Sequence, residues 1–419
     1  MALPHIAPTS PASQSPKPAR SFLVPFVLVT SLFFLWGLAN ILNSALIAHF
    51  QPVFEISRAQ ALLVETAFYF GYFTIAIPAG LFMEKRSYKS GILFGLLLYA
   101  TGALLFIPAA KTLTFGFFLV ALYIIASGLA FLETAANPYV SILGNPNTSV
   151  QRLNFAQSFN GVALVVGPWM AGQFIFAGNE GTMHTEALRQ QAANAVILPY
   201  VWIAGAVLLV ALLICMVRMP EPAKEGKLVF DWSVLKHKHL RWAIITQLFY
   251  VGAQVGIWGI TINYIVDLIP GTSREAASKE YMAIGTFLFV AGRFLGTWLL
   301  TFIKDHQLLA YYGAAAVVLC AAGIFGEGKV AVYAILSINF FMSIMFPTIF
   351  ALGVKDLGEQ TKLASSFLIM AIVGGAIIPP FMGLLADHVG IQASFILPAV
   401  CFLTVVYYGA RGYRIKKSL

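Results

Sequence analysis

An acidic side chain lies inside one of the most apolar stretches of the sequence. Glu133 belongs to the segment AFLETAANP, in which Asn137 and Pro138 follow about one helical turn later. A carboxyl group in such surroundings costs several kcal/mol unless it is protonated, paired or hydrated. Because Pro138 has no N–H, the carbonyl of Thr134 is free to accept a hydrogen bond. These groups could bind a proton or a sugar hydroxyl. The alternative is a structural ion pair, with Arg293 as the candidate partner.

Two further segments carry aromatic and amide side chains on one helical face. The first stripe follows the spacing i, i+4, i+7, i+8 and contains Trp36, Asn40, Asn43 and Ser44. The second stripe contains Gln247, Tyr250, Gln254, Trp258 and Thr261. An aromatic ring packs on the C–H face of a pyranose while amides pair with its hydroxyl groups, so both stripes are typical of a sugar site. They could also serve as hydrogen-bonding contacts between membrane helices.

The composition indicates which elements must position these residues. Hydrophobic residues make up 59% of the 419 residues and charged residues only 10%, whereas soluble domains carry about 25% charged residues. At roughly 20 apolar residues per bilayer crossing, the chain holds about twelve helical spans. Apolar runs place them at residues 22–49, 59–82, 88–109, 113–138, 153–177, 196–218, 240–268, 277–302, 308–325, 330–353, 363–386 and 392–413. The sequence therefore predicts an all-α membrane protein in contact with lipid.

The basic residues give the orientation of these spans. Of the 26 Lys and Arg residues, nineteen fall in segments on the side of the N-terminus, six fall on the opposite side, and Arg293 lies within a span. This distribution is a topology signal and not a nucleic-acid site, and it predicts that both termini are cytoplasmic. We expect a disordered tail at residues 1–20, a cytoplasmic linker at 220–239 and a short tail at 415–419.

An internal repeat divides the chain into two halves. The segment NPYVSILG at residues 137–144 matches FPTIFALG at 346–353, and PWMAG at 168–172 matches PPFMG at 379–383. Two six-helix halves repeated in parallel, here residues 21–219 and 240–414, indicate the major facilitator superfamily fold. In that fold the substrate site lies between the halves near the membrane midplane.

The two halves differ in polarity at matched positions. The N-half residues Glu133, Asn154, Gln157 and Asn160 align with the C-half residues Met342, Ala364, Phe367 and Met370. Since a polar group inside a membrane is costly unless it faces a cavity or a partner, the N-half is expected to supply most hydrogen bonds to a substrate. The C-half would supply more of the apolar wall.

A second carboxyl group, that of Glu65, lies about two turns into the second span from the outer surface. Tyr69 and Tyr72 share its helical face, and Ser44 lies at a similar depth in the first span. Glu65 could therefore approach Ser44. Alternatively, its side chain could extend toward the outer headgroups.

The sequence contains no signature of an enzyme or of a bound cofactor. It has no nucleotide-binding loop, no HExxH pattern and no nucleophile elbow. Its three cysteines, Cys215, Cys320 and Cys401, lie in apolar stretches without neighbours at metal-ligand spacing. We therefore expect neither catalysis nor a cofactor.

Several segments together resemble the fucose:proton symporter family of the major facilitator superfamily. Among them are LETAANPYVSILG, RLNFAQSFN, YVGAQVGIWG and FPTIFALGVKDLG, and the resemblance runs from about Ser21 to Gly409. It implies uptake of a monosaccharide, driven by a cation gradient, across a bacterial inner membrane. It also implies that Glu133 is the sugar-linked glutamate, that Gln157 and Asn160 line the cavity, and that Asn43 lies beside the proton-binding aspartate.

The sequence departs from the family pattern at three positions. The proton-binding aspartate is replaced by Ser44, Glu65 stands in place of a neutral glutamine, and Leu363 stands in place of a tyrosine. The departure at Ser44 leaves three possibilities for coupling. A proton could use Glu65, Na⁺ could bind to oxygen atoms near Asn43, Ser44, Glu65 and Thr134, or transport could be uncoupled.

These observations predict a monomeric secondary transporter that imports a hexose or 6-deoxyhexose with H⁺ or Na⁺ through alternating access. A drug:proton antiporter of the same fold and an uncoupled sugar facilitator are the alternatives. The predicted substrate-binding residues are Trp36, Asn40, Asn43, Glu133, Asn137, Gln157, Asn160, Gln254 and Trp258. The predicted coupling residues are Asn43, Ser44, Glu65 and Glu133.

Overall fold

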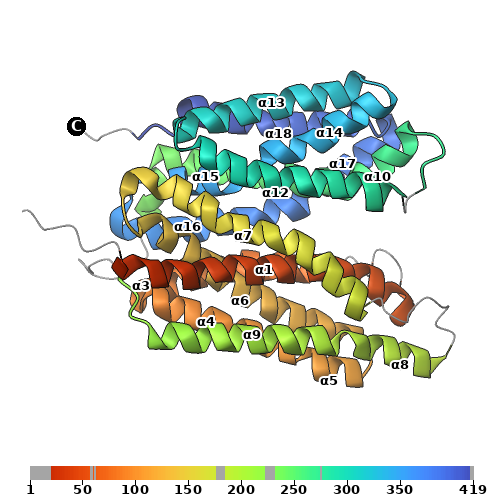
Figure 1. Cartoon of the computed structure of the whole chain (residues 1–419), viewed down its shortest axis with the longest axis horizontal. Coiled ribbons are helices and arrows are strands. Elements are labelled where there is room, and N and C mark those ends of the chain that lie inside the picture. The colour runs from red at the N-terminus through yellow and green to blue at the C-terminus, as the bar shows by residue number, and fades with distance from the viewer. Residues whose placement is uncertain are drawn as a thin grey trace, which may run out of the picture.

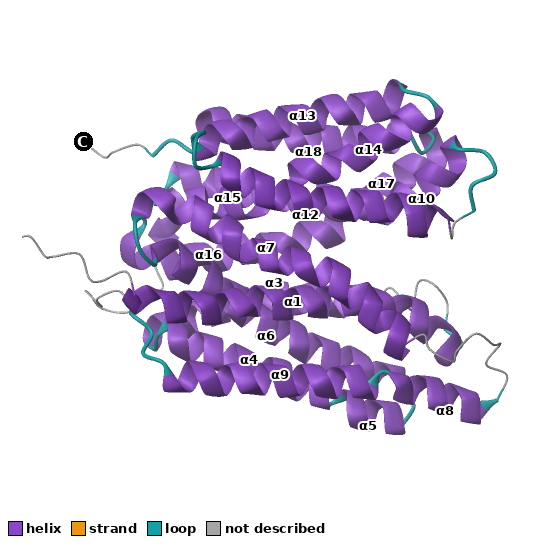
Figure 2. Ribbon diagram, viewed as in Figure 1, coloured by secondary structure: helices purple, strands orange, loops and turns teal. Residues whose placement is uncertain are grey.

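The computed structural model describes residues 20–56, 60, 63–175, 185–221, 232–273 and 276–415. Regular structure in these ranges is entirely helical (Figure 2). The expected N-terminal tail, apart from residue 20, lies outside the described residues. The same is true of residues 222–231 of the expected linker and of residues 416–419.

The described part of the N-half is a bundle of long helices with two short helices. Its elements are α1 (Arg20–Val53), α3 (Leu63–Lys85), α4 (Tyr88–Leu104), α5 (Phe106–Lys111), α6 (Phe115–Ile142), α7 (Ser149–Met170), α8 (Glu186–Ala195) and α9 (Ile197–Met216). Helix α7 continues as a π-helical turn, Ala171–Ile175. Helix α6 packs on α3 and α4, and α1 packs on α7.

The C-half repeats this arrangement with more interruptions. Its elements are α10 (Lys238–Leu268), α12 (Met282–Leu299), α13 (Asp305–Phe325), α14 (Gly328–Met342), α15 (Met345–Gly353), α16 (Thr361–Met370), α17 (Gly374–Val389) and α18 (Ile396–Tyr407). Helix α13 packs on α14 and α18, and α10 packs on α17. Figure 1 shows this half, coloured from green to blue, above the red-to-lime N-half.

Within the described residues the predicted spans are confirmed as helices, with corrections at their ends and interiors. Eleven helical segments of the described residues are long and apolar enough to cross a membrane. Helix α7 is not among them, and it is the helix that carries Asn154, Gln157 and Asn160. Helix α1 already begins at Arg20. The outer connection, where no helix was expected, contains α8, whose first turn is capped by the Thr185 hydroxyl accepting from Leu188 N–H.

Two predicted continuous spans are in fact broken. The span at 330–353 is interrupted between α14 and α15, because Pro347 cannot donate to the carbonyl four residues earlier. The span at 363–386 contains a 3₁₀ turn, Ala371–Val373, between α16 and α17. Gly374 follows that turn, and a Cβ atom there would lie 2.0 Å from the carbonyl oxygen of Leu248. Glycine is therefore required where α17 meets α10.

The halves contact each other mainly toward the side of the membrane that carries both ends of the described chain. There Lys362 Nζ donates to Met83 O at 3.0 Å, and Asn154 Nδ2 donates to Thr348 Oγ1 at 3.1 Å. Gln151 also donates to the carbonyl of Leu300. In Figure 1 the ribbons of the two halves diverge toward the opposite side. A cavity of about 580 Å³ between α10 and α17 lies toward that side.

Candidate functional site

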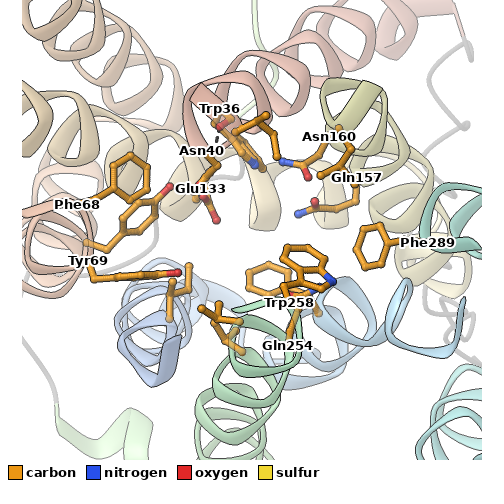
Figure 3. A pocket seen from close by; sticks show the side chains of 18 residues that line it. Trp36, Asn40, Phe68, Tyr69, Glu133, Gln157, Asn160, Gln254, Trp258 and Phe289 are labelled. Carbon is orange, nitrogen blue, oxygen red and sulfur yellow. Dashed lines mark hydrogen bonds between the residues drawn. The ribbon is translucent and has the colours of Figure 1, made fainter. Parts of the chain in front are cut away.

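A cavity of about 170 Å³ lies between the two halves. Helices α1, α3, α6 and α7 line it from the N-half, and α10, α12, α15 and the turn after α16 line it from the C-half. Figure 3 shows Asn40, Glu133, Gln157 and Asn160 on one side, across from Trp258 and Gln254. Seven predicted substrate-binding residues line this cavity: Trp36, Asn40, Glu133, Gln157, Asn160, Gln254 and Trp258.

Glu133 is the acidic group of the polar wall. Only 5% of its surface is exposed, and its Oε1 accepts a hydrogen bond from the Tyr72 hydroxyl at 2.6 Å. The ion pair with Arg293 that the sequence left open is not formed. Arg293 donates instead from Nε to Ser343 O at 2.7 Å and from Nη1 to Gln157 O at 2.8 Å. Glu133 therefore has a neutral donor as its partner, and its carboxyl group faces the cavity.

Asn137 lies behind this wall. Its Nδ2 donates to Glu133 O at 3.0 Å, and its Oδ1 accepts from Gln157 Nε2 at 3.1 Å. Asn137 is fully buried and is not among the residues that line the cavity. It is placed to orient the Gln157 amide, and direct contact with a substrate would require a rearrangement.

The aromatic and amide residues of α1 are held close to α7. The Trp36 ring packs on Phe33 with 4.1 Å between centroids, and Asn40 Nδ2 donates to Trp36 O at 3.0 Å. A Cβ atom on Gly37 would lie 2.9 Å from Asn160 Nδ2. The absence of a side chain at Gly37 thus lets the Asn160 amide reach the cavity.

The C-half wall is largely apolar and aromatic. It consists of Val251, Gln254, Val255, Trp258, Phe289, Phe346 and Ile372. Phe289 meets the Trp258 ring edge-on, with 5.4 Å between centroids and 74° between planes. The guanidinium carbon of Arg293 lies 4.6 Å from the centre of the Phe289 ring. A ligand in this cavity would thus meet most of the hydrogen-bonding groups on the N-half side and aromatic rings on both sides.

The remaining residues of the α10 stripe do not reach the cavity. The Tyr250 hydroxyl donates to Met342 O at 2.8 Å, and Thr261 Oγ1 donates to Ile257 O at 2.6 Å within its own helix. Gln247 is fully buried, and neither of its amide atoms has a hydrogen-bond partner among the described residues. Gln247, Tyr250 and Thr261 therefore belong to the interior of the C-half.

Of the predicted coupling residues whose side chains the structure describes, only Glu133 lines the cavity. Asn43 Oδ1 and Thr134 Oγ1 are both buried oxygen atoms without a hydrogen-bond partner among the described residues. Glu65 is partly buried on α3, beside Tyr69, and does not line the cavity. The side chain of Ser44 lies outside what the structure describes. The described residues contain no group of three or more His, Cys, Asp or Glu that could hold a metal ion.

Sequence reasoning missed Phe289 and Phe346 as cavity residues. Phe289 stands one helical turn before Arg293, a basic residue deep within a predicted span. Phe346 opens the second copy of the repeated octet. Both positions were thus marked by neighbouring features, but phenylalanine is too common in membrane spans to identify a cavity by itself.

Comparison with known proteins gives consistent relatives over nearly the whole chain. The Major Facilitator Superfamily model matches residues 27–371. The L-fucose-proton symporter of Escherichia coli (strain K12) is 42% identical over 410 residues, covering 93% of each chain. A glucose/galactose transporter of Brucella abortus biovar 1 (strain 9-941) is 36% identical over 388 residues, covering 92% of this chain and 93% of the relative.

A solved structure has the same overall arrangement. It is the crystal structure of a Major Facilitator Superfamily transporter, FucP, in the outward conformation. The TM-score is 0.86 at 41% sequence identity, and the match covers 93% of this chain and 99% of that chain.

Proposed function

Because the chain belongs to the fucose:proton symporter family of the major facilitator superfamily, we propose that it imports a monosaccharide, a hexose or 6-deoxyhexose, by symport with a cation. The observation that carries this proposal is the cavity between the halves. Most of its carboxyl and amide groups lie on the N-half side, and aromatic rings line it from both halves. A pyranose presents hydroxyl groups around its edge and C–H groups on its faces, and both kinds of surface find a partner here.

The size of the cavity favours a sugar over a drug. At about 170 Å³, it is smaller than the roughly 300–1,000 Å³ of pockets that hold drug-sized ligands. Glu133, Gln157 and Asn160 would also be costly to leave without hydrogen bonds against a lipophilic cation. These features weigh against the drug:proton antiporter.

Transport would proceed by alternating access of this one site. The halves are joined near Met83, Thr348 and Lys362 and diverge toward the opposite side. With the termini cytoplasmic, as the distribution of Lys and Arg indicates, the described conformation faces outward. The proposed location is the bacterial inner membrane, and the proposed active unit is a monomer without a cofactor and without catalytic activity.

The coupling ion is either H⁺ or Na⁺. Proton coupling would use Glu133 together with Glu65, which would restore an acid in place of the aspartate lost at Ser44. Sodium coupling is supported by the buried and unpartnered Asn43 Oδ1 and Thr134 Oγ1, since oxygen atoms of this kind coordinate hard cations when a carboxylate balances the charge. If neither arrangement forms, the protein is an uncoupled facilitator.

Purified protein in proteoliposomes tests these alternatives. Uptake of labelled L-fucose, D-galactose and D-glucose is measured under an imposed pH gradient and, separately, an imposed Na⁺ gradient. We expect saturable accumulation of at least one sugar under one of the gradients. Equilibration without accumulation would identify a facilitator. Absence of sugar counterflow combined with export of lipophilic cations would contradict the proposal.

A further inference from the structure

The C-half wall of the cavity contains a polar group, the indole N–H of Trp258, that is hydrogen-bonded within the C-half. Trp258 Nε1 donates to Asn339 Oδ1 at 2.7 Å, so the indole N–H is satisfied within the C-half. Asn339 belongs to α14 and does not line the cavity. Only 5% of its surface is exposed, and its Nδ2 donates to Leu336 O at 3.0 Å. Both ends of this amide are therefore fixed, and it holds the indole from behind.

The surroundings of Asn339 are built to accommodate the amide. Helix α12 faces it with Gly285, where a Cβ atom would lie 3.1 Å from Asn339 Nδ2. Phe289, one turn further along α12, packs edge-on against the Trp258 ring. The ring thus has a hydrogen bond at Nε1 and a second ring at its edge, which together leave little freedom for rotation.

Asn339 also reverses the polarity difference between the halves. At the repeat offset of 209 residues it corresponds to Ala130, a buried residue of α6. At the four matched positions Glu133/Met342, Asn154/Ala364, Gln157/Phe367 and Asn160/Met370, by contrast, the polar residue lies in the N-half. A buried amide in the apolar half is costly unless it is needed to satisfy a specific partner. The partner here is the indole of Trp258.

We propose that Asn339 is a positioning residue for substrate recognition: it holds Trp258 so that the indole presents its apolar face to the sugar. This inference rests on the proposed sugar transport. Without the Asn339 acceptor, the indole N–H would be left unsatisfied, and the ring would turn toward water or toward the hydroxyl groups of the ligand. The sugar would lose its stacking surface, while the polar groups of the N-half would remain in place.

A double-mutant cycle tests this role. Asn339→Leu, Trp258→Phe and the double variant are compared with the wild type in counterflow of labelled L-fucose, D-galactose and D-glucose. Asn339→Leu alone is expected to raise KM about tenfold with Vmax within about twofold, since it removes the acceptor of one buried hydrogen bond. In the Trp258→Phe background, which has a ring but no N–H, the same change is expected to leave KM unaltered. Asn339→Asp retains an oxygen acceptor, so its KM is expected to lie closer to wild type than that of Asn339→Leu.

The outcomes separate this inference from the function on which it rests. An equal rise of KM in both backgrounds, or no rise in either, would overturn the positioning role. If the wild type transports none of the three sugars, the proposed function fails instead. Should Asn339→Leu not reach the membrane, Asn339→Ala with and without Trp258→Phe provides the same comparison.

Discussion

Helix α6 and its repeat partner, the broken pair α14 and α15, use the same sequence feature differently. Both segments carry a proline, Pro138 and Pro347, that frees the carbonyl group four residues earlier. In the C-half that carbonyl belongs to Ser343, between α14 and α15, and Arg293 Nε donates to it at 2.7 Å. In α6 it belongs to Thr134, and the helix continues unbroken past it to Ile142.

The difference shows how one repeat can serve two purposes. The C-half uses its freed carbonyl to anchor Arg293, which also bonds to Gln157 O across the boundary between the halves. The N-half keeps Glu133 beside its freed carbonyl and directs the carboxyl group toward the cavity. One copy therefore supports the structure, and in the proposed function the other would supply groups for a ligand and a coupling ion.

The largest expected effect comes from removing the acid of the N-half. Glu133→Ala should abolish saturable sugar binding, a loss of at least about 100-fold, because a hydrogen-bonding and ionisable group is deleted from the polar wall. Glu133→Gln should retain some binding but lose gradient-driven accumulation, since an amide cannot take up a proton or balance a cation. Binding is measured by equilibrium dialysis and accumulation in proteoliposomes.

The matched C-half residue provides the control for that experiment. Met342→Leu conserves volume and apolar character, so it should leave both binding and accumulation near wild type. Wild-type accumulation by Glu133→Gln would contradict the role assigned to the N-half acid.

The next largest effect is expected at Arg293, which links the C-half to the carbonyl group of Gln157 in the N-half. Arg293→Ala removes the donor to two carbonyl groups, those of Ser343 and Gln157, and should reduce the rate of uptake about tenfold. Arg293→Lys retains the charge but lacks the planar arrangement of donors, so it should recover only part of the loss. Initial uptake rates and thermal unfolding in detergent measure the two consequences. Full recovery by lysine would show that charge alone is required.

A smaller and more selective effect is expected at Glu65. If this carboxyl group replaces the family aspartate, Glu65→Gln should lose accumulation driven by a pH gradient and keep sugar counterflow close to wild type. Uptake under pH and Na⁺ gradients, measured side by side, tests this. Full accumulation by the variant under either gradient would mean that Glu65 serves only as a residue near the outer headgroups.

The smallest effect is expected where the halves meet on the side of the termini. Thr348→Val keeps the shape of the side chain but removes the acceptor for Asn154 Nδ2. The loss of one neutral hydrogen bond, about 1 kcal/mol, should shift the balance between outward- and inward-facing states by less than about tenfold. Sugar affinity from the outer side of proteoliposomes should fall slightly. An unchanged affinity would mean that this contact does not favour the described state.

The sequence was sufficient for much of this description. Apolar runs of about 20 residues with few charges predicted the spans because a bilayer leaves the backbone no alternative to helices. The repeat of Asn137–Gly144 predicted two halves, and the helical spacing of Trp36 and Asn40 placed both on one face. Most of the predicted binding residues line the cavity, because a polar group inside a membrane span has few other acceptable positions.

Only the tertiary structure decided which partner each polar group takes. Spacing places Asn137 and Glu133 on one face of α6, but Asn137 bonds to Gln157 of another helix while Glu133 accepts from Tyr72 of a third. The sequence offered Arg293 as a partner for Glu133. In the structure Arg293 instead donates to the carbonyl oxygens of Ser343 and Gln157. Asn339 is an amide within a predicted span, but the sequence could not identify its partner, Trp258, which is 81 residues away. Periodicity determines the face on which a side chain lies, whereas hydrogen-bond partners depend on the packing of helices that are distant in the sequence.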